Sequence, residues 1–532
     1  MSEPAAQNDV GASIHRGGVV RWLVYVLPAL VLVAMTLPRM GQSLWYDEFW
    51  RTKLFLNEQT LHDRLFRDVH NPLYNACMYV WINVFGDGEI SIRIPSLVLG
   101  VAIVVLAVWW ARRLVGEVGA WVTGLFLAVS PVVIWHSADA KNVMLATLAS
   151  VGCLVCVERT ATRSSKDVSS ALPLWKRPAV WLCAALIVGG FTSWNSLFAA
   201  ICAMLAAATV WKRVGKWNWL AMGWAWLAAL LAMLPLLIYK SMQIPELMRR
   251  HTRYFDWREV VLFVTNWLPS GNTMWPVQPY EDKARAFTPP QQWFTLAMAA
   301  VVLSLVFIGL RGLVRRGNAV WVVRPMWIGL ALIFAASAAV RAWYGDGKWN
   351  IYQERNLLWM IVPFAIMLGA GVRMGIVGDQ HHRWRDAAAR WSGLLLAVCI
   401  LALPLMGSVR MMTTEKNVWT VYKPNPDWRS AARLIEAHGG ANARVMEEDG
   451  YQLDPLWYYG PALQRVVVPR DSWLGNEVFI RMSGPADPMY VVDQRHRYPY
   501  NMGRFDRNGV SREFIGQVDG LTVHKVWREV AQ

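Results

Sequence analysis

The stretch SLWYDEFWRTKLFLNEQTLHDRLFRDVHNPL, residues 43–73, follows the first apolar segment of the chain and carries two adjacent carboxylates, Asp47 and Glu48. Aromatic side chains bound this pair on both sides, at Trp45, Tyr46, Phe49 and Trp50. Aromatic rings tolerate both lipid and water, and the low dielectric near lipid strengthens the field of a charge. The acidic pair therefore indicates a functional site at a membrane surface, with a solvated turn at a helix end as the alternative.

The composition indicates a polytopic membrane protein. Of the 532 residues, 55% are hydrophobic and only 17% are charged, and 32 are Trp. These values differ from those of an ordinary soluble protein. The net charge of +16 is spread over the loops between apolar runs, a pattern that membrane orientation and anionic lipids explain better than a nucleic-acid partner does.

The six cysteines predict no disulfide framework, because nearly all fall in apolar segments and the last section of the chain has none. Cys153 and Cys156 have the CxxC spacing of a redox pair. Their position in an apolar helix favours a packing role instead.

The acidic stretch lies outside the cytoplasm if residues 22–37 form the first span. Arg16 and Arg21 flank this apolar run, and no small-residue cleavage site follows it. These features predict an uncleaved span with a cytoplasmic N-terminus.

The next apolar run, residues 73–85, has about a dozen residues, against about 20 needed to cross a bilayer. We expect it to lie along the outer surface. Residues 92–110 then run inward and end at Arg112 and Arg113, which the positive-inside rule places in the cytoplasm. Residues 120–135 return outward and deliver the segment that follows them to the same face as Asp47.

Basic clusters continue this alternation and predict about eleven spans up to residue 408. The predicted fold class is a polytopic α-helical membrane protein with a small outer α/β domain. The expected organisation is a cytoplasmic tail at 1–20, a transmembrane domain at 21–409 with outer loops at 39–90 and 240–291, and an outer domain at 410–532.

The outer domain is predicted from a change in composition after residue 410. An amphipathic helix is expected at 428–437, and strand-like runs lie at 443–446, 464–468 and 489–492, with Gly and Pro between them. Its charges would form either a docking surface or a merely solvated face.

Charged residues recur where predicted helices meet the outer face. They are Asp47, Glu48, Asp139, Lys141, Arg341, Lys348, Glu354 and Arg355. Charges near hydrocarbon are costly unless they pair or face a wet cavity, so their recurrence predicts such a cavity. For any single arginine, the alternative is a side chain that extends to the interface.

Five segments together resemble the bacterial glycosyltransferase family 39, within the GT-C superfamily. They are YDEFW at 46–50, HNPLY at 70–74, FGDGEISIRIPS at 85–96, SPVVIWHSADAKNVM at 130–144 and QERNLLWMIVP at 353–363. This family includes protein O-mannosyltransferases and the lipid A aminoarabinose transferase. The resemblance covers about residues 22–377, and DWRSAARLIEAH at 427–438 is similar to the start of the outer domain of many bacterial members.

The resemblance implies a GT-C-like transferase in the bacterial inner membrane, with its site and outer domain facing the periplasm. Such an enzyme takes a sugar from a polyprenyl-phosphate donor and passes it to an acceptor glycan, lipid or protein. Its base removes the acceptor hydroxyl proton, and cations stabilise the leaving phosphate. The implied catalytic carboxylates are Asp47, supported by Glu48 and Asp139. The implied donor-phosphate ligands are Arg355, Lys348 and Arg341, and the implied cavity residues are His70, Tyr74, His136, Lys141 and Glu354.

Two segments depart from the family pattern. Asp139-Ala-Lys-Asn-Val stands where an acidic-Ala-Arg-Met-Tyr-like run is usual, and Asn71 interrupts the His-Pro-Pro-Leu form. These departures indicate a changed sugar or acceptor.

Three other hypotheses stay open from the sequence. The carboxylates with His70 and His136 also suit a divalent ion such as Mg or Mn. A flippase or transporter of lipid-linked sugar is the rival class, although the sequence shows no inverted repeat. A non-catalytic cell-envelope assembly protein is the other.

Overall fold

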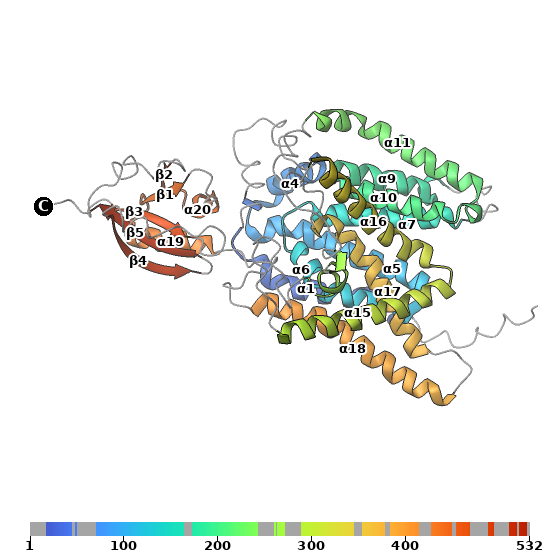
Figure 1. Ribbon diagram of the computed structural model, residues 1–532. Helices are drawn as coiled ribbons and strands as arrows, with labels where there is room; N and C mark the ends of the chain where they lie inside the picture. Colours follow the sequence, from blue (N-terminus) through green and yellow to red (C-terminus); the bar gives the residue numbers. More distant parts are fainter. Residues whose placement is uncertain are drawn as a thin grey trace, which may run out of the picture.

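The computed structural model describes residues 18–44, 48–49, 71–163, 173–242, 260–261, 263–271, 289–344, 354–377, 383–413, 427–448, 454–468, 488–493, 510–518 and 521–528. These residues form a large helical body and a small α/β unit at one end of it (Figure 1). The helical part comes first in the chain and the α/β part last, and the predicted domain bounds stay a prediction.

The helical body is assembled from most of the described chain. Its helices are α1 (Gly18–Met40), α4 (Pro72–Phe85), α5 (Glu89–Val129), α6 (Pro131–Ser137), α7 (Val143–Ala161), η1 (Leu174–Lys176), α9 (Pro178–Thr192), α10 (Trp194–Ala208), η2 (Trp211–Arg213), α11 (Lys216–Ser241), η3 (Phe263–Trp267), α14 (Leu268–Ser270), α15 (Pro289–Arg315), α16 (Ala319–Tyr344), η4 (Glu354–Met360), α17 (Ile361–Val377) and α18 (Arg383–Thr413). Within the described ranges, six helices are long and apolar enough to cross a membrane. The predicted polytopic helical fold is confirmed, and the count of about eleven spans stays a prediction.

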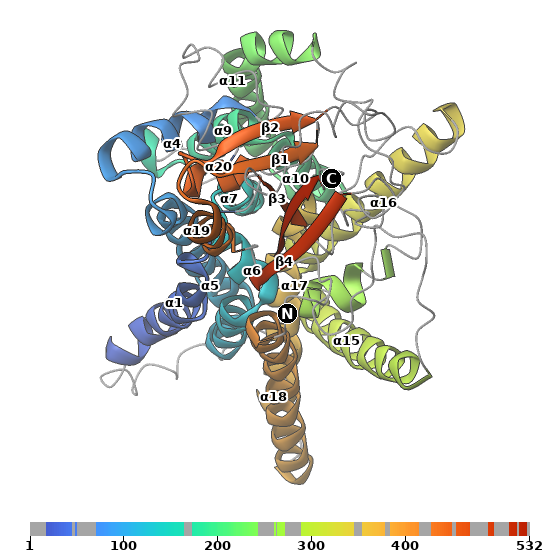
Figure 2. The ribbon, with the colours of Figure 1, turned by 90° about the vertical axis from the view of Figure 1, so that its left-hand side faces the viewer.

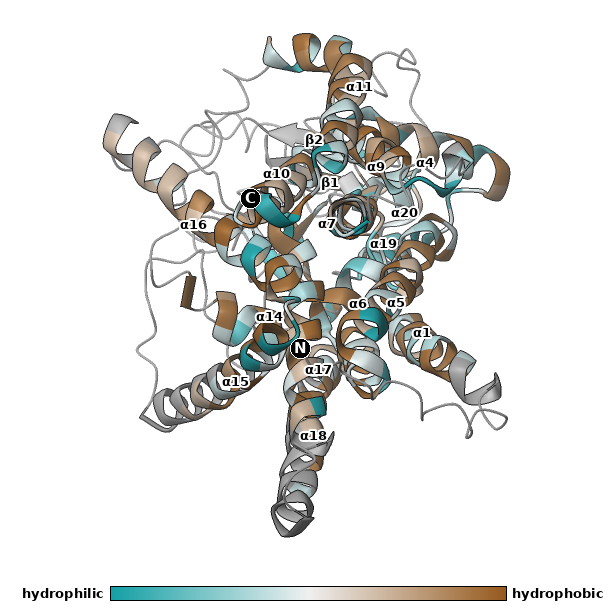
Figure 3. Cartoon of the chain, turned by 90° about the vertical axis from the view of Figure 1, so that its right-hand side faces the viewer, coloured by the Kyte–Doolittle hydropathy of each residue, from teal (hydrophilic) through white to brown (hydrophobic). Residues whose placement is uncertain are grey.

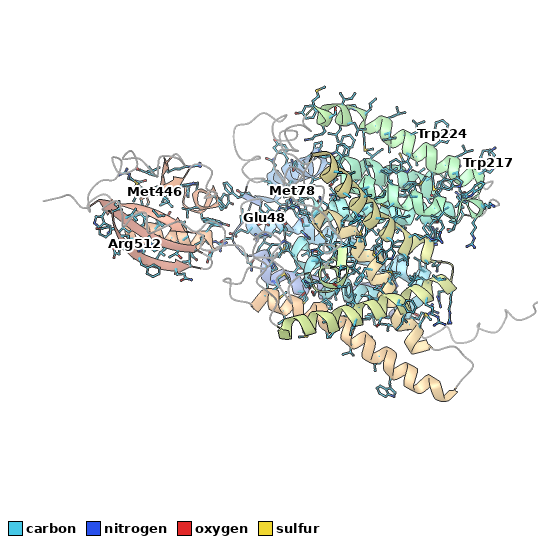
Figure 4. The ribbon with its side chains drawn as sticks, in the orientation of Figure 1. Glu48, Met78, Trp217, Trp224, Met446 and Arg512 are labelled. Carbon is cyan, nitrogen blue, oxygen red and sulfur yellow. The ribbon has the colours of Figure 1, made fainter. Side chains whose placement is uncertain are left out.

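The helices of the body differ in how far neighbouring helices enclose them. Seen from the α/β unit, α5, α7 and α17 lie toward the middle, and α1, α15 and α18 lie at the periphery (Figure 2). α17 is almost wholly enclosed, whereas α11 turns apolar side chains such as Trp217, Trp224 and Leu231 outward (Figures 3 and 4). An exposed apolar face of this length suits contact with lipid.

Helix α5 contains two of the predicted spans, separated by a break at Gly116. Its φ of 81° is a left-handed value that favours glycine. The Arg373 guanidinium donates a hydrogen bond of 2.7 Å to the carbonyl of Val115, and a Cβ at Gly116 would meet that guanidinium at 3.0 Å. The break therefore falls where the sequence predicted a cytoplasmic turn between two spans.

Helix α4 is the short apolar run that was predicted to lie along the surface. Proline occupies its first turn, and Gly86 with φ 81° ends it. Tyr74, Met78 and Ile82 form its buried face, and Val84 on the other side is exposed. It lies at the end of the body that faces the α/β unit (Figure 1).

The α/β unit is a five-stranded sheet with two helices. Its strands are β1 (Arg444–Glu448), β2 (Gln464–Val468), β3 (Met489–Asp493), β4 (Val510–Val518) and β5 (Leu521–Arg528), in the order β2-β1-β3-β5-β4. β1 pairs in parallel with β2 and β3, while β5 is antiparallel to β3 and β4. The helices α19 (Trp428–Gly439) and α20 (Asp454–Tyr459) complete it, and α19 packs its buried face, Trp428 and Ile435, against the sheet core.

The strands predicted at 443–446, 464–468 and 489–492 coincide with β1, β2 and β3. The sequence did not indicate the hairpin of β4 and β5 or the helix α20. Only Val510 of β4 is buried, and a bulge at Phe514/Gly516 interrupts the register of the strand, so its hydrophobic pattern lacks the alternation of a half-buried strand.

The crossing of α5 and α17 yields a test of the fold. A Cβ at Gly369 would meet the Gly119 carbonyl oxygen at 2.3 Å, and backbone cannot move aside. We expect Gly369→Ala to cost about 1–3 kcal/mol of folding free energy. Gly223→Ala on α11 is the control, because a Cβ there meets nothing within 4 Å. Melting midpoints in detergent measure both, and equal midpoints would contradict the close crossing.

Candidate functional site

The site is organised around a buried ion pair between Glu48 and Arg93. Their exposed fractions are 1% and 0%. The Arg93 Nε and Nη2 atoms donate to Glu48 Oε1 and Oε2 at 2.8 and 2.6 Å, a two-point, charge-assisted contact. The Ala140 amide also donates to Glu48 Oε1, at 3.1 Å. Glu48 thus joins the first turns of α5 to the turn between α6 and α7.

Arg93 also gathers the chain that leaves α1. Its remaining three hydrogens reach four nearby backbone carbonyls, those of Arg39 at 3.3 Å, Met40 at 2.8 Å, Gln42 at 2.6 Å and Ser43 at 3.2 Å. Nη1 contacts three of these carbonyls with its two hydrogens, so at least one hydrogen is shared. The segment that leads to the acidic pair is therefore wrapped around a single side chain of α5.

The turn between α6 and α7 brings several predicted site residues together. His136, Asp139 and Lys141 are all buried, with His136 Nδ1 3.9 Å from Asp139 Oδ2. Burial, together with the charges of Lys141, Arg355 and Arg39, holds the pKa of His136 well below 6.5. This histidine is therefore neutral at neutral pH, and Asp139 lies beside a neutral ring.

A polar cavity opens next to this turn. Lys141 and Asn142 just before α7, the α9–α10 turn and η4 line it, and its cavity volume is about 40 Å³. The lining residues are Lys141, Asn142, Val143, Ala146, Thr147, Ser150, Ser193, Asn195, Arg355, Asn356 and Trp359. Two cations, three amide side chains and hydroxyl groups suit an anion, and the remaining wall is apolar.

The predicted residues whose side chains the structure describes fall into three groups. Lys141 and Arg355 line the cavity. His136 and Asp139 lie at the α6–α7 turn next to it, and Glu48 contacts that turn through the Ala140 amide. Tyr74 is buried away from the lining, with its hydroxyl 3.4 Å from Ser96 Oγ, in an apolar cluster with Phe49 and Met78.

The other predicted residues are not placed as side chains. Asp47, His70 and Lys348 lie outside the described residues, and for Arg341 and Glu354 the structure describes only the backbone, in α16 and at the start of η4. Among the residues that the structure does describe, no group of three or more His, Cys, Asp or Glu side chains comes together as a metal site.

Sequence reasoning missed several residues of the site. Arg93 is a lone charge in the apolar run after residue 89, which by itself signals a functional or paired side chain. Arg39, whose guanidinium lies 3.9 Å over the Trp135 ring, carries the same signal at the end of α1. Ser193 and Asn195 lie between two apolar runs. Polar residues at that position were the sequence signal that could have indicated a cavity wall.

No model of a protein family matches the sequence, and neither does any curated protein sequence. The fold is that of the GT-C glycosyltransferases, which are polytopic membrane proteins, so the predicted GT-C-like fold is confirmed.

Two of the matching structures are of ArnT from Cupriavidus metallidurans, a lipid A aminoarabinose transferase. The apo structure is 14% identical, with a TM-score of 0.54 over 95% of this chain and 98% of that chain. The structure bound to undecaprenyl phosphate is also 14% identical, with a TM-score of 0.52 over 96% and 98%. At this identity, the likeness establishes the fold.

Replacing Arg93 tests the energetic role of the buried pair. Arg93→Met would leave the Glu48 carboxylate buried without its cation, which costs about 3–5 kcal/mol. Arg112→Met on the same helix is the control, because Arg112 and its partner Glu117 are 31% and 48% exposed. It should cost less than about 1 kcal/mol. The midpoint of unfolding in detergent measures the difference. Glu48→Gln added to Arg93→Met should recover part of the loss, and no recovery would mean that the two side chains are not coupled.

Proposed function

We propose that this protein is an integral-membrane glycosyltransferase that moves a sugar from a polyprenyl-phosphate-linked donor to an acceptor glycan, lipid or protein. The observation that carries the proposal is the cavity in which Lys141 and Arg355, from separate elements, lie together with amide and hydroxyl donors. The fold shared with ArnT supports it, since one ArnT structure holds undecaprenyl phosphate.

The cavity suits the phosphate end of a lipid-linked donor. The guanidinium of Arg355 offers a planar fork for two phosphate oxygens, and Lys141 offers a compact charge beside it. Asn142 is held in place by its hydrogen bond of 3.1 Å to the Thr192 carbonyl. The apolar wall that includes Trp359 suits the first isoprene units. Arg341 and Lys348 are proposed as further phosphate contacts.

In the proposed reaction, the acceptor hydroxyl attacks the anomeric carbon while the bond from that carbon to the phosphate oxygen breaks. Asp47 takes the hydroxyl proton, and Arg355 and Lys141 stabilise the charge that develops on the polyprenyl phosphate. Glu48 directly follows Asp47 in the sequence, and its bonds to Arg93 and Ala140 support a role in holding the base beside the α6–α7 turn.

The remaining site residues receive supporting roles in this proposal. Asp139 is proposed to add negative charge to the site, and His136, whose pKa burial lowers, is proposed as a hydrogen-bonding group. His70, Tyr74 and Glu354 are proposed to shape the acceptor side. The cavity and the α/β unit are proposed to face the periplasm from the bacterial inner membrane, as the basic clusters in the predicted inner loops indicate.

A transfer assay decides between the enzyme and its rivals. Purified protein is incubated with radiolabelled polyprenyl-phosphate sugar and a membrane extract. Label appearing on a new acceptor supports the proposal. Movement of the intact lipid between vesicles without sugar transfer would support a transporter. If neither transfer nor lipid movement is observed, the non-catalytic assembly role is the remaining hypothesis.

Replacing Asp47 tests the base. Asp47→Asn keeps the shape and removes the charge, so turnover should fall by about 10²–10⁴-fold, or about 3–5 kcal/mol of barrier. Glu48→Gln should lower turnover less, and Asp68→Asn in the same loop should leave it unchanged. Steady-state transfer rates measure all three. The reverse order for Asp47 and Glu48 would exchange their roles, and parental rates for both would remove the base from this loop.

Replacing Arg355 tests the phosphate site. Arg355→Lys keeps the charge but loses the two-point contact, so KM for the donor should rise about 10- to 100-fold. Arg311→Lys on the exposed side of α15 is the control and should bind donor normally. Titration with undecaprenyl phosphate provides a second readout. Unchanged donor affinity in Arg355→Lys would place the phosphate elsewhere.

A further inference from the structure

The α/β unit contacts the helical body at the segment that leads to the acidic pair. The hydroxyl of Tyr459, the last residue of α20, accepts a hydrogen bond of 2.7 Å from the Leu44 amide and donates one of 2.8 Å to Glu89. Glu89 also forms an ion pair with Arg429 of α19. One tyrosine hydroxyl therefore links the outer unit, the start of α5 and the chain three residues before Asp47.

Contacts from the outer unit flank the acidic pair on both sides. Before it, Ser43 Oγ donates to Asp427 Oδ1 at 3.1 Å, and the same carboxylate caps α19 by accepting from the Ser430 amide. After it, the Phe49 ring meets Tyr458 edge to face, with centroids 5.9 Å apart. Figure 4 shows Glu48 at the end of the body that faces the outer unit.

The same helix carries both attachments of this segment. Glu89 and Arg93 are four residues apart on α5, one turn along the same face. Glu89 binds the outer unit, and Arg93 binds Glu48 and the backbone carbonyls at the end of α1 and just after it. Burial raises the pKa of Tyr459, so its hydroxyl stays protonated and can donate to Glu89 while accepting from Leu44.

We propose that Tyr459 is a positioning residue. Through its hydroxyl, the outer unit fixes the position that the acidic segment, residues 43–49, needs for turnover. The proposal rests on the proposed function, because the segment it holds carries the proposed base. It assigns the outer unit a part in turnover that is separate from donor binding. No described contact joins Tyr459 to the residues that line the cavity.

The test compares Tyr459→Phe with Tyr458→Phe. Each variant loses one hydroxyl and keeps its ring, but the Tyr458 hydroxyl contacts Asp87, at 3.3 Å, and not the acidic segment. Hydrogen exchange of peptides covering residues 41–49 reports how well the Leu44 amide is protected by its hydrogen bond to Tyr459. This measurement does not require an active enzyme. Transfer from the radiolabelled polyprenyl-phosphate donor reports kcat and KM separately.

We expect Tyr459→Phe to speed exchange in this segment about tenfold and to lower kcat about 3- to 10-fold, with KM for the donor within about twofold. Tyr458→Phe should leave both values at the wild-type level. Equal exchange in the two variants, or a lower kcat accompanied by an equal loss of donor affinity, would overturn the proposal. A wild-type protein that transfers no sugar would contradict the proposed function, and exchange alone would then decide whether Tyr459 holds the segment.

Discussion

The ion pair of Arg93 and Glu48 is the interaction on which the rest of the site depends. A guanidinium at 0% exposure must find a partner for its charge and acceptors for its hydrogens, and here it takes the carboxylate and four backbone carbonyls. A buried pair contributes little net stability, because desolvation offsets the attraction. What it provides is one defined path for the chain from the end of α1 to the acidic pair.

That path explains why the site lies where the helical body meets the outer unit. Glu48 fixes the turn between α6 and α7 through Ala140, and this turn leads directly to Lys141 and the cavity. One turn before Arg93, Glu89 carries the contacts with Tyr459 and Arg429. The cavity, the acidic segment and the outer unit are thus connected through the first two turns of α5.

The sequence predicted the elements of the fold better than the partners within the site. Apolar runs and basic clusters were sufficient for the helices, because a bilayer imposes both length and charge asymmetry. They did not predict the hairpin of β4 and β5, because β4, with Val510 as its one buried residue, lacks the alternating pattern of a half-buried strand, even though β5 is largely buried. Lys141 and Arg355, which line the cavity, were predicted from charge at helix ends, but Arg93 was not, because its partner is 45 residues away in the chain. Pairing over such distances is set by packing, which local patterns do not encode.

A structure of the protein with undecaprenyl phosphate, determined by cryo-electron microscopy in a lipid nanodisc, tests the central claim most directly. We expect phosphate density in the polar cavity, within hydrogen-bonding distance of both Arg355 and Lys141, with the prenyl chain leaving along the wall that contains Trp359. Phosphate density away from these two cations, or a cavity that stays empty at saturating lipid, would contradict it.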